Sequence, residues 1–134
     1  MTNVNDIEGI GPDRAEKLKA AGVTTTDDLL KLGGTPKGRK DLEAATGLSG
    51  AFILDWVNRA DLFRIKGIGT QYSDLLEASG VDTVAELAQR RADNLTKKLA
   101  EVNEAKKIVR ALPAETVVAD WIEQAKALPR AVEY

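Results

Sequence analysis

The sequence predicts an all-α fold in which two tandem copies of one helical unit pack into one compact helical body. Two repeats predict the copies. The pattern I-x-G-I-G at residues 7–11 returns 58 positions later at residues 65–69, and an apolar stripe around a tryptophan returns 65 positions later. Apolar residues recur at helical spacing, and no stretch alternates as a half-buried strand would. We expect units at residues 1–62 and 63–134 that unfold as one cooperative domain.

Each unit is expected to contain a tight turn made by two glycines around one isoleucine. Residues 1–6, ahead of the first turn, are expected to be a frayed leader with at most one helical turn. Glycine enters positive φ without steric cost, so Gly9 and Gly11 can form the turn while the isoleucine anchors it in the core. Pro12 is expected at the first position of the next helix, where its missing N–H is harmless. The same reasoning predicts a turn at residues 65–69.

A glycine and a valine are expected to end the helix that follows each turn. Gly22 suits the left-handed residue that stops a helix, with Leu18 three positions inside the end and Val23 just beyond the stop. Those two side chains touch in the Schellman motif. The second copy repeats the arrangement with Leu76, Gly80 and Val81.

Threonines indicate the starts of the helices that come next. In residues 24–30 a threonine cap precedes two acidic residues, which the helix dipole favours in the first turn. In the second copy, Thr83 and Glu86 have the spacing of a capping box. Both patterns therefore predict a helix start rather than a pair of catalytic carboxylates.

A flexible basic loop is expected at residues 33–40, leading into a helix from roughly 39 to 46. The loop lacks the order G-x-x-x-x-G-K-[ST] and no strand leads into it, so it is not a phosphate-binding P-loop. Gly47 is expected to end this helix, and Ser49 is expected to cap the next one.

The tryptophan helices carry matching apolar stripes, which indicate buried faces. The stripe residues are Phe52, Ile53, Trp56, Val57, Ala60 and Phe63 in the first copy, and Val117, Val118, Trp121, Ile122, Ala125 and Leu128 in the second. Core packing is therefore expected for both tryptophans rather than stacking on a base. The second copy is about seven residues longer, around 94–113, where we expect a long helix, broken near Asn103 and ended by Pro113.

The composition argues against an enzyme. The 134 residues include no histidine and no cysteine, which removes the commonest general base near neutral pH, the commonest metal ligand and any thiolate nucleophile. We expect no catalytic residue, no metal and no cofactor. The first residues are not a signal peptide, and no apolar run approaches membrane-spanning length. A cytoplasmic protein without a membrane partner is expected.

The glycine turns, the glycine–valine helix ends and segments 35–40, 56–62 and 120–121 together resemble tandem helix-hairpin-helix proteins of the SAM-domain-like class. The chain is most similar to a small bacterial domain family of unknown function with paired hairpins. The likeness covers nearly the whole chain, and it implies that the helix around Trp56 also serves as the first helix of the second hairpin. It implies the fold more than the function, because fold does not fix function.

Nucleic-acid binding is the first function that the resemblance implies. In hairpins that grip DNA, backbone N–H groups at the helix start meet a phosphate, and nearby lysines or arginines add charge. The second turn is expected to dominate, since Lys66 replaces Glu8 and Thr70 replaces Pro12. The candidate residues are Gly9, Gly11 and Arg14 at the first turn, Arg64, Lys66, Gly67, Gly69 and Thr70 at the second, and Lys37, Arg39 and Lys40 in the basic loop.

The charge balance keeps a second function open, a protein–protein interaction or scaffold module in which the turns are structural. The net charge is −2: residues 1–63 carry 8 basic and 10 acidic groups, and residues 64–134 carry 11 of each. Neither half has the basic excess typical of a nucleic-acid binder. Lys106, Lys107 and Arg110 are expected to form a solvated helix face. The choice between a DNA or RNA backbone and a protein partner stays open.

Overall fold

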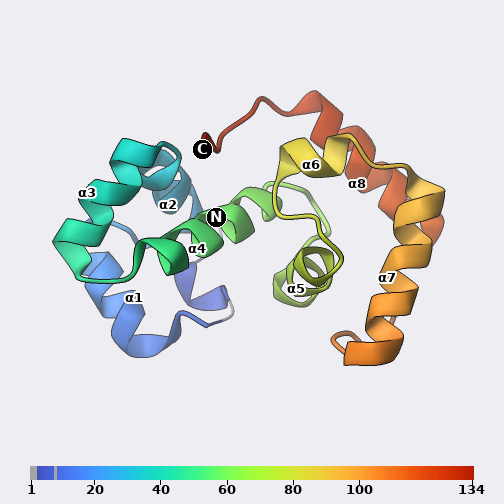
Figure 1. Cartoon of the computed structure of the whole chain (residues 1–134), viewed down its shortest axis with the longest axis horizontal. Helices are drawn as coiled ribbons and strands as arrows, with labels where there is room; N and C mark the ends of the chain where they lie inside the picture. The colour runs from blue at the N-terminus through green and yellow to red at the C-terminus, as the bar shows by residue number, and fades with distance from the viewer. Residues whose placement is uncertain (1–2, 8) are drawn as a thin grey trace. The chain divides into compact units, whose positions relative to one another are not determined.

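A computed structural model describes residues 3–7 and 9–134 of the chain, and this part is helical. Its only bridge between extended residues is an isolated one from Asn3 to Thr25, so the all-α prediction is confirmed. The elements are η1 (Val4–Asp6), α1 (Gly11–Ala20), α2 (Thr26–Gly33), α3 (Pro36–Thr46), α4 (Gly50–Leu62), α5 (Thr70–Ala78), α6 (Val84–Ala88), α7 (Ala92–Lys106) and α8 (Glu115–Ala127) (Figure 1).

The chain divides into two compact units. Unit 1 comprises Met1–Phe63 together with Ala131–Tyr134, and unit 2 comprises Arg64–Arg130. In unit 1, α2 packs against α3 and α4, while α1 contacts η1 and α3. In unit 2, α6 and α7 pack against α8, and α5 contacts α7. Whether the two units unfold together stays a prediction.

Each unit has an apolar core around one tryptophan. The Trp56 side chain is 2% exposed and that of Trp121 is 1% exposed, which confirms the prediction of core packing. The first stripe position of each tryptophan helix is different, because Phe52 and Val117 stay exposed. In unit 1 the core also includes Val4, Ile7, Ile10, Leu18, Val23, Leu29, Leu42, Leu48, Ile53, Val57, Ala60 and Val132.

The two predicted glycine helix ends are confirmed in detail. Gly22 has φ of 93°, its N–H donates to the Lys19 carbonyl at 3.0 Å, and the Val23 N–H donates to the Leu18 carbonyl at 2.8 Å. These are the two bonds of a Schellman motif. The matching bonds after α5 run from Gly80 to Glu77 at 3.0 Å and from Val81 to Leu76 at 2.9 Å, with φ of 91° at Gly80.

Because an L-residue strains in this left-handed conformation, we expect Gly22→Ala and Gly80→Ala each to lower the free energy of unfolding by about 1 kcal/mol. Gly22→Asn and Gly80→Asn should lose less, since asparagine tolerates positive φ better than alanine does. Urea unfolding followed by circular dichroism measures the difference. Alanine and glycine chains of equal stability would contradict the role of these positions as helix stops.

In the described part of the chain, side-chain caps begin four of the α-helices. Thr25 and Asp28 form a complete capping box at α2, and the N–H groups of Thr24 and Thr25 hold the pKa of the Asp28 carboxyl below its ordinary value. At α6, Thr83 caps the Glu86 N–H at 3.3 Å, while the Glu86 carboxylate accepts from the Asp82 N–H at 3.2 Å. Thr35 and Ser49 cap α3 and α4.

Three local predictions need correction. Residues 4–6 form one 3₁₀ turn, η1, as the prediction allowed, but Val4 is buried in the unit 1 core, so this part of the leader is not frayed. Helix α3 starts at Pro36 rather than near residue 39, because Thr35 caps it and the proline fits its first turn.

Helix α7 stops well before Pro113. It ends at Lys106, followed by Lys107 in a left-handed conformation with φ of 51°. The Asn103 side chain then holds the next segment: its Oδ1 accepts from the Val109 N–H at 2.9 Å and its Nδ2 donates to the Val109 carbonyl at 3.1 Å. The Val109 side chain is buried, and this burial stabilises the non-helical path of the chain after α7.

Candidate nucleic-acid interface

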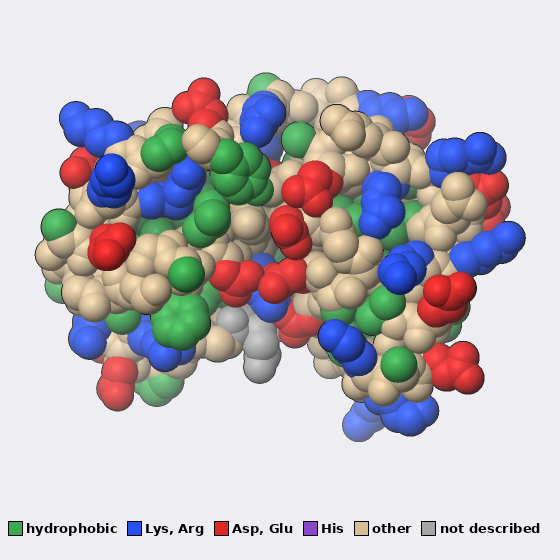
Figure 2. Space-filling view, in the orientation of Figure 1, with side chains coloured by type: hydrophobic (Ala, Val, Ile, Leu, Met, Phe, Trp, Pro, Cys, Tyr) green, Lys and Arg blue, Asp and Glu red, His purple; other side chains and the backbone are tan. Residues whose placement is uncertain are grey.

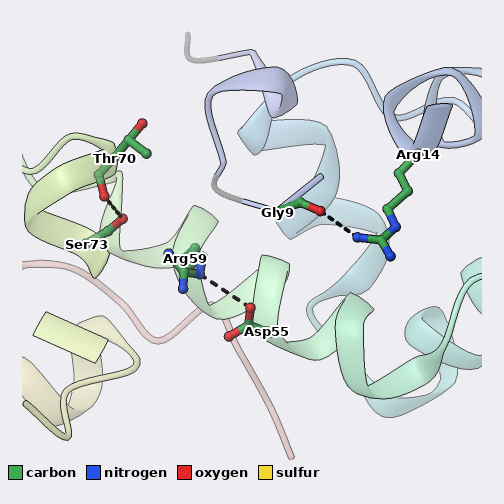
Figure 3. A network of polar contacts seen from close by, with 6 residues as sticks. All are labelled: Gly9, Arg14, Asp55, Arg59, Thr70 and Ser73. Atoms are coloured by element: carbon green, nitrogen blue, oxygen red, sulfur yellow. Dashed lines mark hydrogen bonds and ion pairs between the residues drawn. The ribbon is translucent and has the colours of Figure 1, made fainter. Parts of the chain in front are cut away.

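The first glycine turn forms a hydrogen bond with the side chain of Arg14. Gly9 and Gly11 have φ of 90° and 69°, and the isoleucines on either side of Gly9 are buried. Arg14, on α1, donates from Nη1 to the Gly9 carbonyl at 2.6 Å (Figure 3). Its guanidinium carbon lies 4.8 Å from the centre of the Phe52 ring, within cation–π range. Arg14 therefore connects the turn with α4 by contacting both.

Two further features weaken the first turn as an anion site. Pro12 is the second residue of α1, so one of the N–H groups at this helix start is missing. A surface depression beside Gly11 and Pro12 is lined by Glu16 as well as by Lys19. Glu8, which we expected at the mouth of this turn, lies outside the described residues.

The second turn is held by a glutamine from α8. The Lys66 N–H donates to Gln124 Oε1 at 2.9 Å, and Gln124 Nε2 donates to the Lys66 carbonyl at 3.2 Å. Gln124 Nε2 also donates to Asp120 Oδ2 at 2.9 Å, which fixes the orientation of the amide. Both backbone groups of Lys66 are thus engaged inside unit 2, while its side chain is exposed.

The two glycines of the second turn differ. Gly67 has φ of 99°, and a Cβ added there would lie 3.0 Å from the Trp121 Nε1. Gly69 has φ of −105°, a conformation open to any residue, and no neighbouring atom lies within 4 Å of a Cβ added there. Only Gly67 needs to be glycine, because it alone combines positive φ with a close neighbour.

Helix α5 starts in a surface depression at this turn. Within the described chain, its first turn has no side-chain cap, and its N-cap residue is Gly69. The Thr70 carbonyl accepts a hydrogen bond from Ser73 Oγ at 2.8 Å (Figure 3). The depression is lined by Gly67, Gly69, Thr70, Gln71, Tyr72, Arg110 and Ala111.

Arg110 was missed as a site residue by sequence reasoning. It was expected on a solvated helix face, but α7 has already ended, and the segment after it brings exposed Arg110 to the second turn. Tyr72 fixes this segment, since its hydroxyl donates to the Ala111 carbonyl at 3.1 Å. The sequence signal that could have revealed Arg110 is Asn103, whose side chain holds Val109 and turns the chain away from the helix.

Arg64 and the basic loop are placed differently from Lys66. Arg64 Nη2 donates to the Pro129 carbonyl at 2.7 Å. Arg39 is only 9% exposed and donates to two backbone carbonyls, those of Gly33 at 3.0 Å and Glu133 at 2.6 Å. Lys37 and Lys40 are exposed on α3. Arg39 is therefore not part of the candidate interface, because its guanidinium is buried and already donates these two hydrogen bonds.

The exposed charges are of mixed sign. On the face drawn in Figure 2, lysine and arginine side chains are interspersed with aspartate and glutamate side chains over both units. Some cations are paired locally, as Arg59 is with Asp55 at 3.3 Å along α4 (Figure 3). Any phosphate contact would therefore depend on a few positioned cations rather than on a broad positive field.

Metal-binding clusters and membrane-spanning helices are both absent from the described residues. Residues 3–7 and 9–134 contain no group of three or more aspartates and glutamates placed to hold a metal ion. In the same part of the chain, every helix is too short or too polar to cross a membrane.

Comparison with known protein families assigns most of the chain to one of them. Residues 8–128 match the model of a family described as a domain of unknown function, DUF4332. No curated protein and no solved structure matches the chain. The helix-hairpin-helix character of the turns therefore stays a prediction.

Proposed function

Since the chain belongs to the DUF4332 family, its function is inferred from its own geometry, and we propose that it is a non-catalytic binding module for the phosphate backbone of nucleic acid. In this proposal the two units are tandem helix-hairpin-helix repeats, and the second turn is the main contact. The observation that supports it most is the start of α5, which lacks a side-chain cap and lies in a depression with Arg110.

The chemistry of that depression suits a phosphate. N–H groups of a first helical turn have no intrahelical acceptor, and the helix dipole favours an anion there. Arg110 lines the depression and Lys66 directly precedes its lining residue Gly67; both side chains are exposed and would supply positive charge. Gln71 lines the same depression, and its side-chain amide can donate hydrogen bonds to phosphate oxygens.

The first turn has a minor role in this proposal. Its Arg14 is already bonded to Gly9 and covers the Phe52 ring, and Pro12 removes one donor. Contacts to phosphates position a nucleic acid without reading its bases. The module should therefore bind with little sequence preference.

We expect Lys66→Glu and Arg110→Glu each to weaken binding of fluorescently labelled DNA by about tenfold at low salt, since each replaces an attractive charge by a repulsive one. Lys97→Glu is the matched control, because it makes the same charge change at an exposed position of α7 outside the depression. Fluorescence anisotropy with duplex and single-stranded DNA, repeated at rising salt, measures the effect.

Equal weakening by all three variants would show a general charge effect and contradict a site at the second turn. No binding up to about 100 μM protein, the weak end of non-specific affinity, would contradict the nucleic-acid proposal itself.

A protein–protein interaction module is the second candidate, supported by exposed apolar side chains. Phe52 is 47% exposed and Val117 is 42% exposed, at matching positions near the starts of α4 and α8. Phe52 lies on unit 1 and Val117 on unit 2, so each would serve as an apolar contact on its own unit. The absence of DNA binding in the titration above would favour this candidate, with both glycine turns as structural corners.

A further inference from the structure

The segment 131–134 belongs to unit 1, although it follows the last helix of unit 2 in the sequence. After α8 ends at Ala127, the chain runs on, and Val132 becomes part of the unit 1 core with only 2% of its surface exposed. In Figure 1 this end of the chain lies beside α2. No sequence pattern predicted this docking, because a single valine, Val132, makes the apolar contact.

Unit 1 engages both backbone groups of Glu133. The Glu133 N–H donates to the Gly34 carbonyl at 2.7 Å, and the Glu133 carbonyl accepts from Arg39 Nη2 at 2.6 Å. The side chain of Glu133 is exposed. Unit 1 thus binds the main chain of Glu133 through two hydrogen bonds, while its core takes up the side chain of the preceding valine.

The receiving surface is made of residues from unit 1. Arg39 is buried and is oriented by its second bond, from Nη1 to the Gly33 carbonyl at 3.0 Å. Gly34 allows the close approach of the segment, because a Cβ at that position would lie 2.6 Å from the Ala131 carbonyl oxygen. Asn58 adds a third contact, since its Oδ1 accepts from the Tyr134 hydroxyl at 3.1 Å.

We propose that unit 1 contains a binding site for an extended peptide with a β-branched apolar anchor, and that residues 131–134 are its resident, displaceable ligand. Arg39 and the Gly34 carbonyl bind the backbone of the residue after the anchor. The apolar core of unit 1 takes up the anchor side chain. Val132 is the buried residue of this segment, while Glu133 and Tyr134 stay exposed. Segments of this kind open more readily than a packed helix does.

The test uses a labelled peptide of residues 128–134, acetylated and amidated, titrated into two full-length chains. The first chain carries Val132→Asp, which disables its own segment and leaves the site free. The second is wild type, whose tethered segment competes with the peptide. We expect saturable binding to the Val132→Asp chain and binding at least about tenfold weaker to the wild type, because a tether raises the local concentration of the resident segment.

Two control peptides give the specificity. A peptide with Val132→Asp should not bind, because an aspartate would be buried in an apolar pocket. A peptide with Glu133→Gln should bind like the wild-type peptide, because that side chain is exposed. Equal binding of the valine and aspartate peptides, or no binding to a Val132→Asp chain that keeps its helical circular dichroism, would overturn the proposal.

Hydrogen exchange in the wild-type chain provides a second test. The Glu133 amide should exchange through a local opening, faster than the Val57 amide in the middle of α4. Equal and slow exchange at both amides would show that the segment is an integral part of the core and would overturn displacement. Loss of folding in the Val132→Asp chain would overturn it for the same reason.

Discussion

Replacing Trp121 by alanine is expected to lower the free energy of unfolding by about 3–5 kcal/mol, the usual cost of removing a buried tryptophan. Trp121 is 1% exposed on α8, the helix against which α6 and α7 pack. Its ring centre lies 5.3 Å from that of Tyr72, and its indole nitrogen faces Gly67. The cavity would therefore loosen the helix packing and the second turn together. Urea unfolding followed by circular dichroism measures the loss.

Val117→Ala is the matched control on the same helix. Val117 is 42% exposed, so this substitution should change the free energy of unfolding by less than about 0.5 kcal/mol. A similar small loss for Trp121→Ala would contradict the burial of the indole. The prediction that Trp121 is a core residue rather than a base-stacking one would then be wrong.

The milder Trp121→Phe variant also tests whether the units unfold together. The chain has two tryptophans, so Trp56 fluorescence then reports on unit 1 alone. In a single cooperative domain, the fluorescence midpoint should fall with the circular-dichroism midpoint, although the substitution lies in unit 2. A Trp56 transition that stays at the wild-type midpoint would show two independent units.

Local sequence signals predicted most of the fold. The Schellman ends at Gly22 and Gly80 depend on residues at most five positions apart, and so do the threonine caps. Both tryptophans were predicted to be buried because an apolar stripe at helical spacing indicates a buried face. Predictions of this kind succeed because the stabilising contacts lie within one or two helical turns.

The site depends on contacts between residues far apart in the sequence, which a pattern cannot show. Gln124 holds the Lys66 peptide from 58 residues away, and Arg39 bonds Glu133 from 94 residues away. From the sequence alone, Arg39 was expected to be available to a ligand, because it lies in a basic loop. The structure instead buries it. Arg110 was misplaced for a related reason, because α7 ends in a left-handed lysine, a conformation that few residues other than glycine adopt.

Gly67→Ala should lower the free energy of unfolding by about 2–4 kcal/mol, combining backbone strain with crowding. Gly67 has φ of 99°, and its new methyl group would lie 3.0 Å from Trp121 Nε1. The indole cannot move aside easily, because its side chain is almost fully buried in unit 2. The same unfolding measurement applies.

Two other glycines separate the causes of that loss. Gly9→Ala meets positive φ of 90° without a neighbour within 4 Å, so it should cost only about 1 kcal/mol. Gly69→Ala meets neither strain nor crowding and should change the free energy of unfolding by less than about 0.5 kcal/mol. Equal losses at Gly9 and Gly67 would show that Trp121 does not crowd the turn. A large loss at Gly69 would contradict the extended conformation of that residue.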